Sequence, residues 1–152
     1  MPRRSMRLPK KKVWDMKKEG YFDPNNTYWT YGTIASSNHK IIFLGGSVSL
    51  DAKGNLVGKG DMRAQIRQCM ENIKAMLAVE EATLKDIVNR RIYTTDIEEY
   101  YRACKGWASK AYPEFWDRTP GAQGAPSGTL LQVSRLGGKD FLVEIEVFAA
   151  ID

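Results

Sequence analysis

The chain contains few of the residues that hold transition metals, with two cysteines and one histidine among its 152 residues. Cys69 and Cys104 do not form a CxxC or zinc-finger spacing, and the single histidine, His39, excludes a site built from several histidines. A glycine-rich phosphate loop and a nucleophile elbow are also missing. We therefore expect no metal and no cofactor. His39 falls in a predicted hairpin turn that joins the strands expected at residues 31–35 and 40–44, where we expect an exposed side chain rather than a catalytic base.

Long hydrophobic runs are absent as well. No apolar segment approaches the roughly 20 residues that a membrane-spanning helix needs. The N-terminal region has no apolar stretch of the kind found in secretory signals. With 43% hydrophobic and 27% charged residues, the composition is typical of a globular protein of one domain. These features predict a cytoplasmic protein with no membrane partner.

Positive charge is concentrated at the N-terminal end. The net charge of the chain is +5. Residues 1–19 carry eight Lys and Arg against two acidic residues, a net of +6, and the rest has 15 basic and 16 acidic residues, a net of −1. Residues 1–28 also contain several aromatics, which predicts an extended arm that docks through them, followed by one domain over residues 29–152. Because that domain is near neutral, nucleic acid is an unlikely partner on charge alone.

Hydrophobic spacing predicts elements in the order β-β-α-β-α-β-β. Asp61 is expected to cap one helix, and Asp96 followed by Glu99 a second one. Both cysteines lie on the apolar faces of these helices, where burial is the expected role. The Pro- and Gly-rich residues 112–127 predict a long loop. The strands are expected at residues 31–35, 40–44, 91–95, 126–136 and 141–150. The pattern indicates an α+β domain with two helices on one face of a mixed sheet.

The last two predicted strands carry the most informative pattern. Only residues 137–140 separate them, which predicts a β-hairpin. In the second strand, a period of two places Glu144 and Glu146 between Leu142 and Phe148 on one face. Two carboxylates among large apolar side chains indicate a contact surface with a polar site set into it. A sheet face without helices would also need cover from another subunit.

Three segments match known motifs in order. Residues 65–74 fit Q-x-R-Q-x-x-x-N-[IV]-K, and residues 84–96 fit L-x-D-[IV]-[VL]-x-x-x-[VI]-[YF]-x-x-D. The C-terminal strands fit P-A-R-[ST]-x-x-x-V-x-x-L and V-E-I-E-x-x-A at Pro126, Thr129, Val133, Leu136, Val143, Glu144, Ile145, Glu146 and Ala149. The chain thereby resembles the RidA/YjgF family of reactive-intermediate deaminases, small trimeric enzymes that hydrolyse enamines and imines. The resemblance implies a chorismate-mutase-like fold, a homotrimer and active sites in the clefts between subunits.

The resemblance also implies roles for single residues. Glu144 matches the glutamate that positions or activates water. Tyr31 best matches an aromatic residue that covers the substrate, and Gly46 and Ser47 fall where the family's second strand ends and lines the active site. These roles are expectations for the present chain.

One departure from the family signature falls within the expected site. Gly128, followed by Thr129, stands where the family's deaminases carry the arginine that binds the substrate carboxylate. Glycine cannot make that contact. Either another residue supplies the anchor or the substrate has no carboxylate at that place, and the usual amino-acid-derived imines are expected to be poor substrates.

Three classes of function remain open. The first is a hydrolase, deaminase or amine-releasing lyase that acts on an imine, an enamine or a ring-derived amino compound, with Glu144 as the acid–base residue. The aromatic residues Trp29, Phe115 and Trp116 favour an aromatic or ring-derived substrate, such as an aminomuconate-like dienamine. The second is a trimer that binds small molecules without catalysis. The third is RNA binding or cleavage, an activity reported for some members of the family, which the basic arm would assist.

Overall fold

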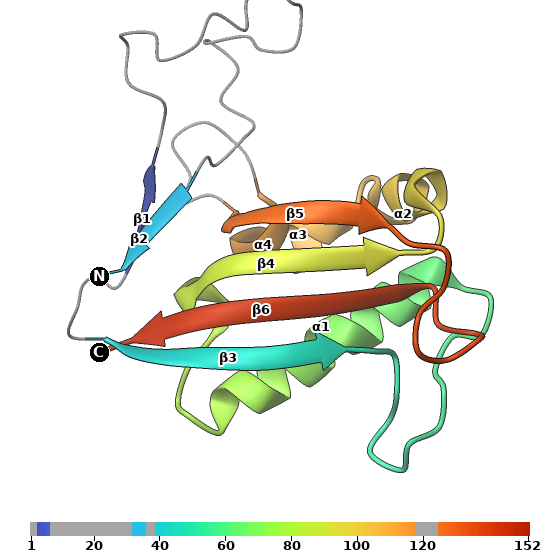
Figure 1. Cartoon of the computed structure of the whole chain (residues 1–152), viewed down its shortest axis with the longest axis horizontal. Helices are drawn as coiled ribbons and strands as arrows, with labels where there is room; N and C mark the ends of the chain where they lie inside the picture. Colours follow the sequence, from blue (N-terminus) through green and yellow to red (C-terminus); the bar gives the residue numbers. More distant parts are fainter. Residues whose placement is uncertain (1–2, 7–31, 36–38, 118–124) are drawn as a thin grey trace, which may run out of the picture.

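The computed structural model describes residues 3–6, 32–35, 39–117 and 125–152. Figure 1 shows a mixed four-stranded sheet with the helices behind it, and a separate pair of short strands. The order in the larger sheet is β3-β6-β4-β5. The predicted α+β class is confirmed. The strands are β1 (Arg3–Met6), β2 (Gly32–Ala35), β3 (Lys40–Ser47), β4 (Ile87–Thr94), β5 (Ser127–Gln132) and β6 (Val143–Ile151).

The helices begin where the sequence predicts. The Asp61 carboxylate accepts a hydrogen bond from the Ala64 N–H at 3.0 Å and caps α1 (Met62–Ala78). Asp96 caps α2 (Ile97–Cys104) through the Glu99 N–H at 2.8 Å. Shorter elements are the 3₁₀ helix η2 (Leu84–Asp86), α3 (Ala108–Ala111) and α4 (Pro113–Trp116). No helix in the described ranges is long and apolar enough to cross a membrane.

Alternation along β6 separates the core from the open face of the sheet. Val143, Ile145 and Val147 are fully buried, and Glu144 and Glu146 between them are half-buried. This is the period of two that the sequence predicts. The buried side chains pack against α1, whose apolar stripe has the helical spacing of three to four. Its buried residues are Met62, Gln65, Ile66, Cys69, Met70, Ile73 and Leu77.

The predicted C-terminal hairpin is wrong. β5 pairs in parallel with β4, whereas β6 pairs antiparallel with both β3 and β4. β4 therefore lies between β5 and β6, and residues 133–142 cross from one side of it to the other (Figure 1). The physical reason is burial: β6 is apolar enough to occupy a central position, while most of β5 is exposed at the edge.

The N-terminal strand pairing and the long loop also differ from the prediction. β2 pairs with β1, not with β3, so part of the predicted arm is a strand; residues 1–2 and 7–31 lie outside the described part. Within residues 112–127, Pro113 begins α4, as proline can at a first helical position. Phe115 is fully buried in the core rather than placed in a loop. Residues 118–124 are not described.

The environment of His39 differs from the sequence prediction. Its Nδ1 lies 3.0 Å from Asp152 Oδ1, and 8% of the side chain is exposed. We expected His39 to be an exposed turn residue, but its side chain is mostly buried. β6 pairs with β3 beside His39, and the chain end that follows β6 brings Asp152 close to it. His39 therefore contacts Asp152 beside neighbouring strand ends and lines neither of the two pockets described below.

Candidate functional site

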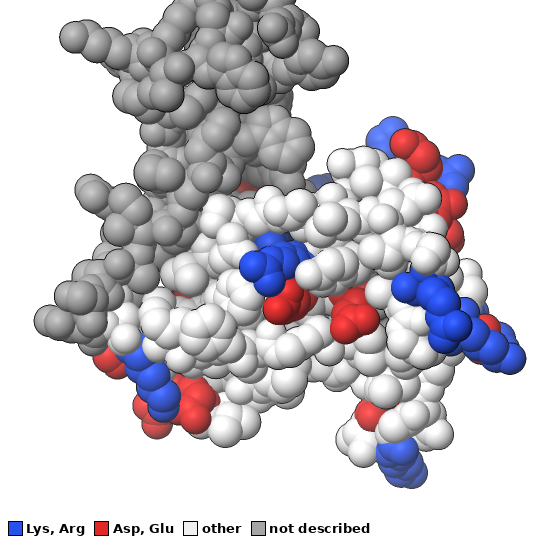
Figure 2. All heavy atoms as spheres, viewed as in Figure 1, with Lys and Arg blue, Asp and Glu red and all other residues white. Residues whose placement is uncertain are grey.

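The sheet face away from the helices is largely apolar. Phe43 is 73% exposed and packs edge-on against Phe148, with ring centroids 5.2 Å apart. The Arg91 guanidinium lies 5.1 Å from the Phe148 ring centroid. Figure 2 shows this face as mostly uncharged, with a small group of basic and acidic side chains near its centre. An exposed face of this kind is suited to contact with another protein surface.

Glu144 lies on this face, directly over a glycine. The register between β3 and β6 shifts between Leu44 and Ser47, which marks a bulge at the end of β3. A Cβ atom added to Gly46 would lie 2.6 Å from Glu144 Cδ and 2.8 Å from its Cγ. Only glycine therefore allows the carboxyl group to occupy this position.

Glu144 and Gly46 line a shallow pocket of about 410 Å³. Tyr93, Arg135 and Glu146 also line this pocket. Cross-strand pairing explains the proximity of Tyr93 and Glu144, because these residues lie opposite each other in β4 and β6. The pocket thus combines a carboxylate, a phenol and a guanidinium, groups that can exchange protons or bind a polar substrate.

Glu146 has different partners from Glu144. Its Oε2 accepts a hydrogen bond from the Arg91 guanidinium at 3.2 Å and one from the Tyr93 hydroxyl at 3.3 Å. These contacts span β4 and β6 and occupy the carboxylate within the sheet. Glu146 is therefore a residue that fixes the strands, and Glu144 is the carboxylate placed over the glycine.

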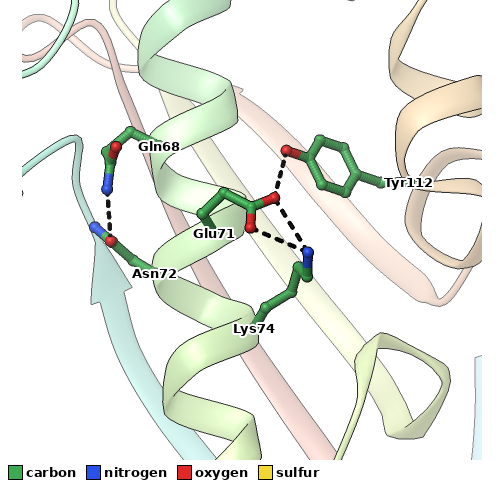
Figure 3. Close-up of polar contacts among 5 residues, drawn as sticks. All are labelled: Gln68, Glu71, Asn72, Lys74 and Tyr112. Carbon is green, nitrogen blue, oxygen red and sulfur yellow. Dashed lines mark hydrogen bonds and ion pairs between the residues drawn. The ribbon is translucent and has the colours of Figure 1, made fainter.

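The motif in α1 supports the strand end that carries Gly46. Ser47 Oγ donates to the Cys69 carbonyl at 3.2 Å and faces the helix. Asn72 donates to the carbonyls of Val48 at 3.1 Å and Leu50 at 2.9 Å, and Gln68 donates to the Asn72 side chain at 2.8 Å. Figure 3 shows the Gln68–Asn72 pair on α1. The motif therefore fixes the loop after β3, and with it the position of Gly46.

The neighbouring Glu71 ties α1 to the short helices. Its carboxylate accepts hydrogen bonds from Lys74 at 3.0 Å and from the Tyr112 hydroxyl at 2.9 Å (Figure 3). The hydrogen bond from Lys74 lowers the pKa of Glu71, and Tyr112 adds to this effect. Burial and the bond to Glu71 raise the pKa of Tyr112 to about 12. The contact holds the segment that leads into α4.

A second, larger pocket lies on the other side of the sheet. It has a volume of about 630 Å³ and lies between the short helices and strands β4 and β5. Gly128 and Thr129 line it, so neither lies in the Glu144 pocket. For Gly128 the strand period explains the separation, because it lies opposite Arg90 in β4, out of phase with Tyr93 on the open face. Thr129 lies opposite Arg91, in phase with Tyr93, and still lines the larger pocket.

Arg90 is a functional candidate that the sequence reasoning missed. It lines the second pocket, is 4% exposed and donates a hydrogen bond to the Phe115 carbonyl. Its guanidinium lies 4.4 Å from the Phe115 ring centroid and 5.9 Å from that of Trp116. The period of two was a usable signal, because Arg90 shares its face with the buried Ile92.

The structure brings only part of the predicted site together. Glu144 and Gly46 meet in one pocket, and Ser47 lies beside them but faces α1. Gly128 and Thr129 line the other pocket, as described above. Tyr31 lies outside the described residues. The substrate contacts expected of all these residues stay predictions.

Neither cysteine is placed for nucleophilic chemistry. Cys69 is fully buried, and burial together with the charge of Glu144 raises its pKa to about 12. Burial also raises the pKa of Cys104, which lines the larger pocket. Both thiols are therefore protonated near neutral pH. Among the described residues, no cluster of His, Cys, Asp and Glu could hold a metal ion.

Sequence comparisons find relatives of this chain. A family model described as Endoribonuclease L-PSP matches residues 24–151. A RutC family protein from Pyrococcus horikoshii is 32% identical over 108 residues, which cover 71% of this chain and 77% of that protein. The region matched by the family model includes the described lining residues of both pockets.

Structural comparisons agree on the fold. A protein of unknown function of the conserved Rid family from Yersinia pestis superposes with a TM-score of 0.73 and 22% identity, over 99% of this chain and 100% of that one. A protein from Thermotoga maritima, described as a putative endoribonuclease, gives a TM-score of 0.60 at 22% identity, over 82% and 87% of the two chains. At these identities the likeness concerns the fold alone.

Proposed function

Since the chain belongs to the endoribonuclease L-PSP family, also known as RidA/YjgF, we propose that it hydrolyses or deaminates a small imine, enamine or ring-derived amino compound. Imine and enamine deamination is a known activity of this family. In the proposed reaction, Glu144 holds the attacking water and transfers its proton.

The observation that carries the proposal is the position of the Glu144 carboxyl group over Gly46. A general acid–base residue must reach its substrate within hydrogen-bond distance. The glycine leaves the carboxyl group at the wall of a pocket that also contains Tyr93 and Arg135. Glu146 is engaged with Arg91 and Tyr93 instead, so Glu144 is the better placed of the two carboxylates.

We further propose that the working unit is a homotrimer. The open face carries Phe43 and Phe148, and a second subunit would remove this apolar surface from water. Within one chain, the Glu144 pocket and the Gly128 pocket lie on opposite faces of the sheet. A site that uses both must take them from neighbouring subunits. Closing the cleft would also shield Glu144 from bulk water.

RNA cleavage is the second candidate, and it rests on the endoribonuclease names of the family model and of the Thermotoga maritima structure. The described pockets contain no histidine, the usual acid–base residue near neutral pH. Hydrolysis of a labelled single-stranded RNA by the purified protein, lost in Glu144→Gln, would support this candidate over the first.

The test of the proposed function compares two isosteric substitutions. Glu144→Gln keeps the shape of the side chain but cannot transfer a proton, so turnover should fall by roughly 10²–10⁴-fold. Glu146→Gln is the matched control on the same strand and face, and it should retain turnover within about tenfold. The assay follows hydrolysis of an aromatic 2-imino acid, generated in situ from phenylalanine by an amino-acid oxidase, because an aromatic substrate is expected to be accepted better than the usual small imines. Full activity of Glu144→Gln would refute the assignment.

A further inference from the structure

The larger pocket has the dimensions of a small-molecule site. Its volume of about 630 Å³ lies within the range of roughly 300–1,000 Å³ that is usual for such sites. Aliphatic side chains from the sheet, including Ile92 and Leu130, form one wall. Tyr100, Tyr101 and Trp116 provide aromatic surface from the helices. A flat apolar group fits between walls of this kind.

Two of the described side chains that line the pocket are cationic. Arg90 and Lys105 line it, and no carboxylate occurs among its described lining residues. Burial raises the pKa values of Tyr100 and Cys104, and the nearby charge of Arg90 partly offsets this rise, so the guanidinium acts on polar groups within the pocket. An anionic group is therefore the part of a ligand that this pocket would favour.

Arg90 is held in place before any ligand arrives. The Phe115 carbonyl accepts one of its N–H donors, and the rings of Phe115 and Trp116 lie beside the guanidinium. Trp116 is itself fixed, because its Nε1 donates to the Tyr100 hydroxyl at 3.1 Å. A fixed, largely desolvated guanidinium binds a carboxylate more strongly than an exposed and mobile one.

Gly128 is adjacent to this arginine in space. A Cβ atom at residue 128 would lie 2.6 Å from Arg90 Cγ and would overlap the Arg90 carbonyl oxygen. An arginine at residue 128 on β5 would therefore not fit beside Arg90 in its present conformation on β4. The guanidinium that the family signature would place at 128 is present in the same pocket, on the neighbouring strand.

We propose that Arg90 is the carboxylate anchor of this pocket and that the substrate is a carboxylate attached to a flat unsaturated or aromatic group. The inference rests on the proposed function, because it names the substrate class of the same composite site. The guanidinium binds the carboxylate, and the aromatic surface of Trp116 and Tyr101 packs against the flat group. Small 2-imino acids would leave most of the volume unfilled.

The experiment measures binding rather than turnover, so its outcome is independent of Glu144 chemistry. Calorimetry compares benzoate with benzamide, a neutral molecule of the same shape, in the full chain. Benzoate should bind at least about tenfold more tightly. Arg90→Met should remove this preference. Arg91→Met, the adjacent arginine on the opposite face, should retain it. Unchanged preference in a folded Arg90→Met protein, or a loss in Arg135→Met instead, would overturn the proposal.

A second measurement uses the unaltered protein, because Arg90 also holds α4 and its substitution can impair folding. Crystals soaked in 4-bromobenzoate locate the ligand through the anomalous signal of bromine. The proposal expects the carboxylate within hydrogen-bond distance of the Arg90 guanidinium. A carboxylate bound elsewhere, or no bound ligand and no calorimetric preference for benzoate, would overturn it. Benzoate binding through Arg90 without turnover of any imine would support the anchor and refute the proposed catalysis.

Discussion

Gly128→Ala tests the steric argument for the absence of a side chain at this position. The added Cβ would lie 2.6 Å from Arg90 Cγ and 3.1 Å from the Arg90 carbonyl carbon, and it would overlap the carbonyl oxygen. The Cγ belongs to a side chain fixed by Phe115, and the other two atoms are backbone. To relieve this overlap, β5 must move away from β4. The same conflict means that Gly128→Arg should not restore a family-type anchor without such a movement.

The expected cost follows from overpacking. Forced backbone shifts in packed regions cost about 1–3 kcal/mol. For a domain of this size, 1 kcal/mol lowers Tm by roughly 2–4 °C, so Gly128→Ala should lower Tm by roughly 2–12 °C. Gly45→Ala is the matched control, since nothing lies within 4 Å of a Cβ at residue 45. Thermal unfolding followed by circular dichroism measures both. A Tm for Gly128→Ala equal to that of the wild type would refute the reasoning.

Three further predictions follow from the described contacts. Gly46→Ala should fold normally, because the added Cβ meets only the mobile end of the Glu144 side chain. Its turnover should fall at least about tenfold relative to Gly45→Ala, because Glu144 is displaced. Equal turnover of the two variants would contradict the assigned position of Glu144. Cys69 is buried and Cys104 half-buried, and both have raised pKa values. At pH 8 they should react with a disulfide reagent at least about 100-fold more slowly in the native protein than in urea. A thiol that reacts in the native protein as fast as in urea would contradict this prediction. The lowered pKa of Glu71 stabilises the fold above its unfolded pKa of about 4.3, and this contribution is lost as the pH falls through the lower folded value. At pH 6.5, Glu71→Gln should therefore lower the free energy of unfolding, measured in urea, by under about 1 kcal/mol; the effect is small because the Glu71 side chain is half exposed. At pH 3 the difference from the wild type should be smaller.

Local patterns in the sequence predicted the parts of the fold that depend on neighbouring residues. Asp61 and Asp96 cap helices as expected, since capping requires only a side chain and the next turn of backbone. The alternation along β6 was also correct. The pairing of β5 with β4 was not predictable in this way, because two apolar strands joined by a short segment satisfy the hairpin pattern equally well.

The candidate site depends more strongly on distant contacts. Glu144 was singled out by its match to the family signature and by its place between apolar residues, but its contact with Gly46 joins two strands that are far apart in the sequence. Arg90 was within reach of the sequence, because a period of two places it with Ile92 on the buried face. Its place in a pocket requires α4, which Pro113 begins inside a segment that composition assigns to a loop.

The most direct test of the composite site mixes two inactive variants. Glu144→Gln and Arg90→Met subunits, each with its own affinity tag, are co-expressed, and the mixed oligomers are isolated through both tags. In a cyclic trimer that contains both kinds, one of the three interfaces combines an intact Glu144 with an intact Arg90 of the neighbour. The isolated mixed trimers should therefore recover about one third of the wild-type turnover, while each parent stays nearly inactive. Mixed oligomers no more active than their parents would contradict a site shared between subunits.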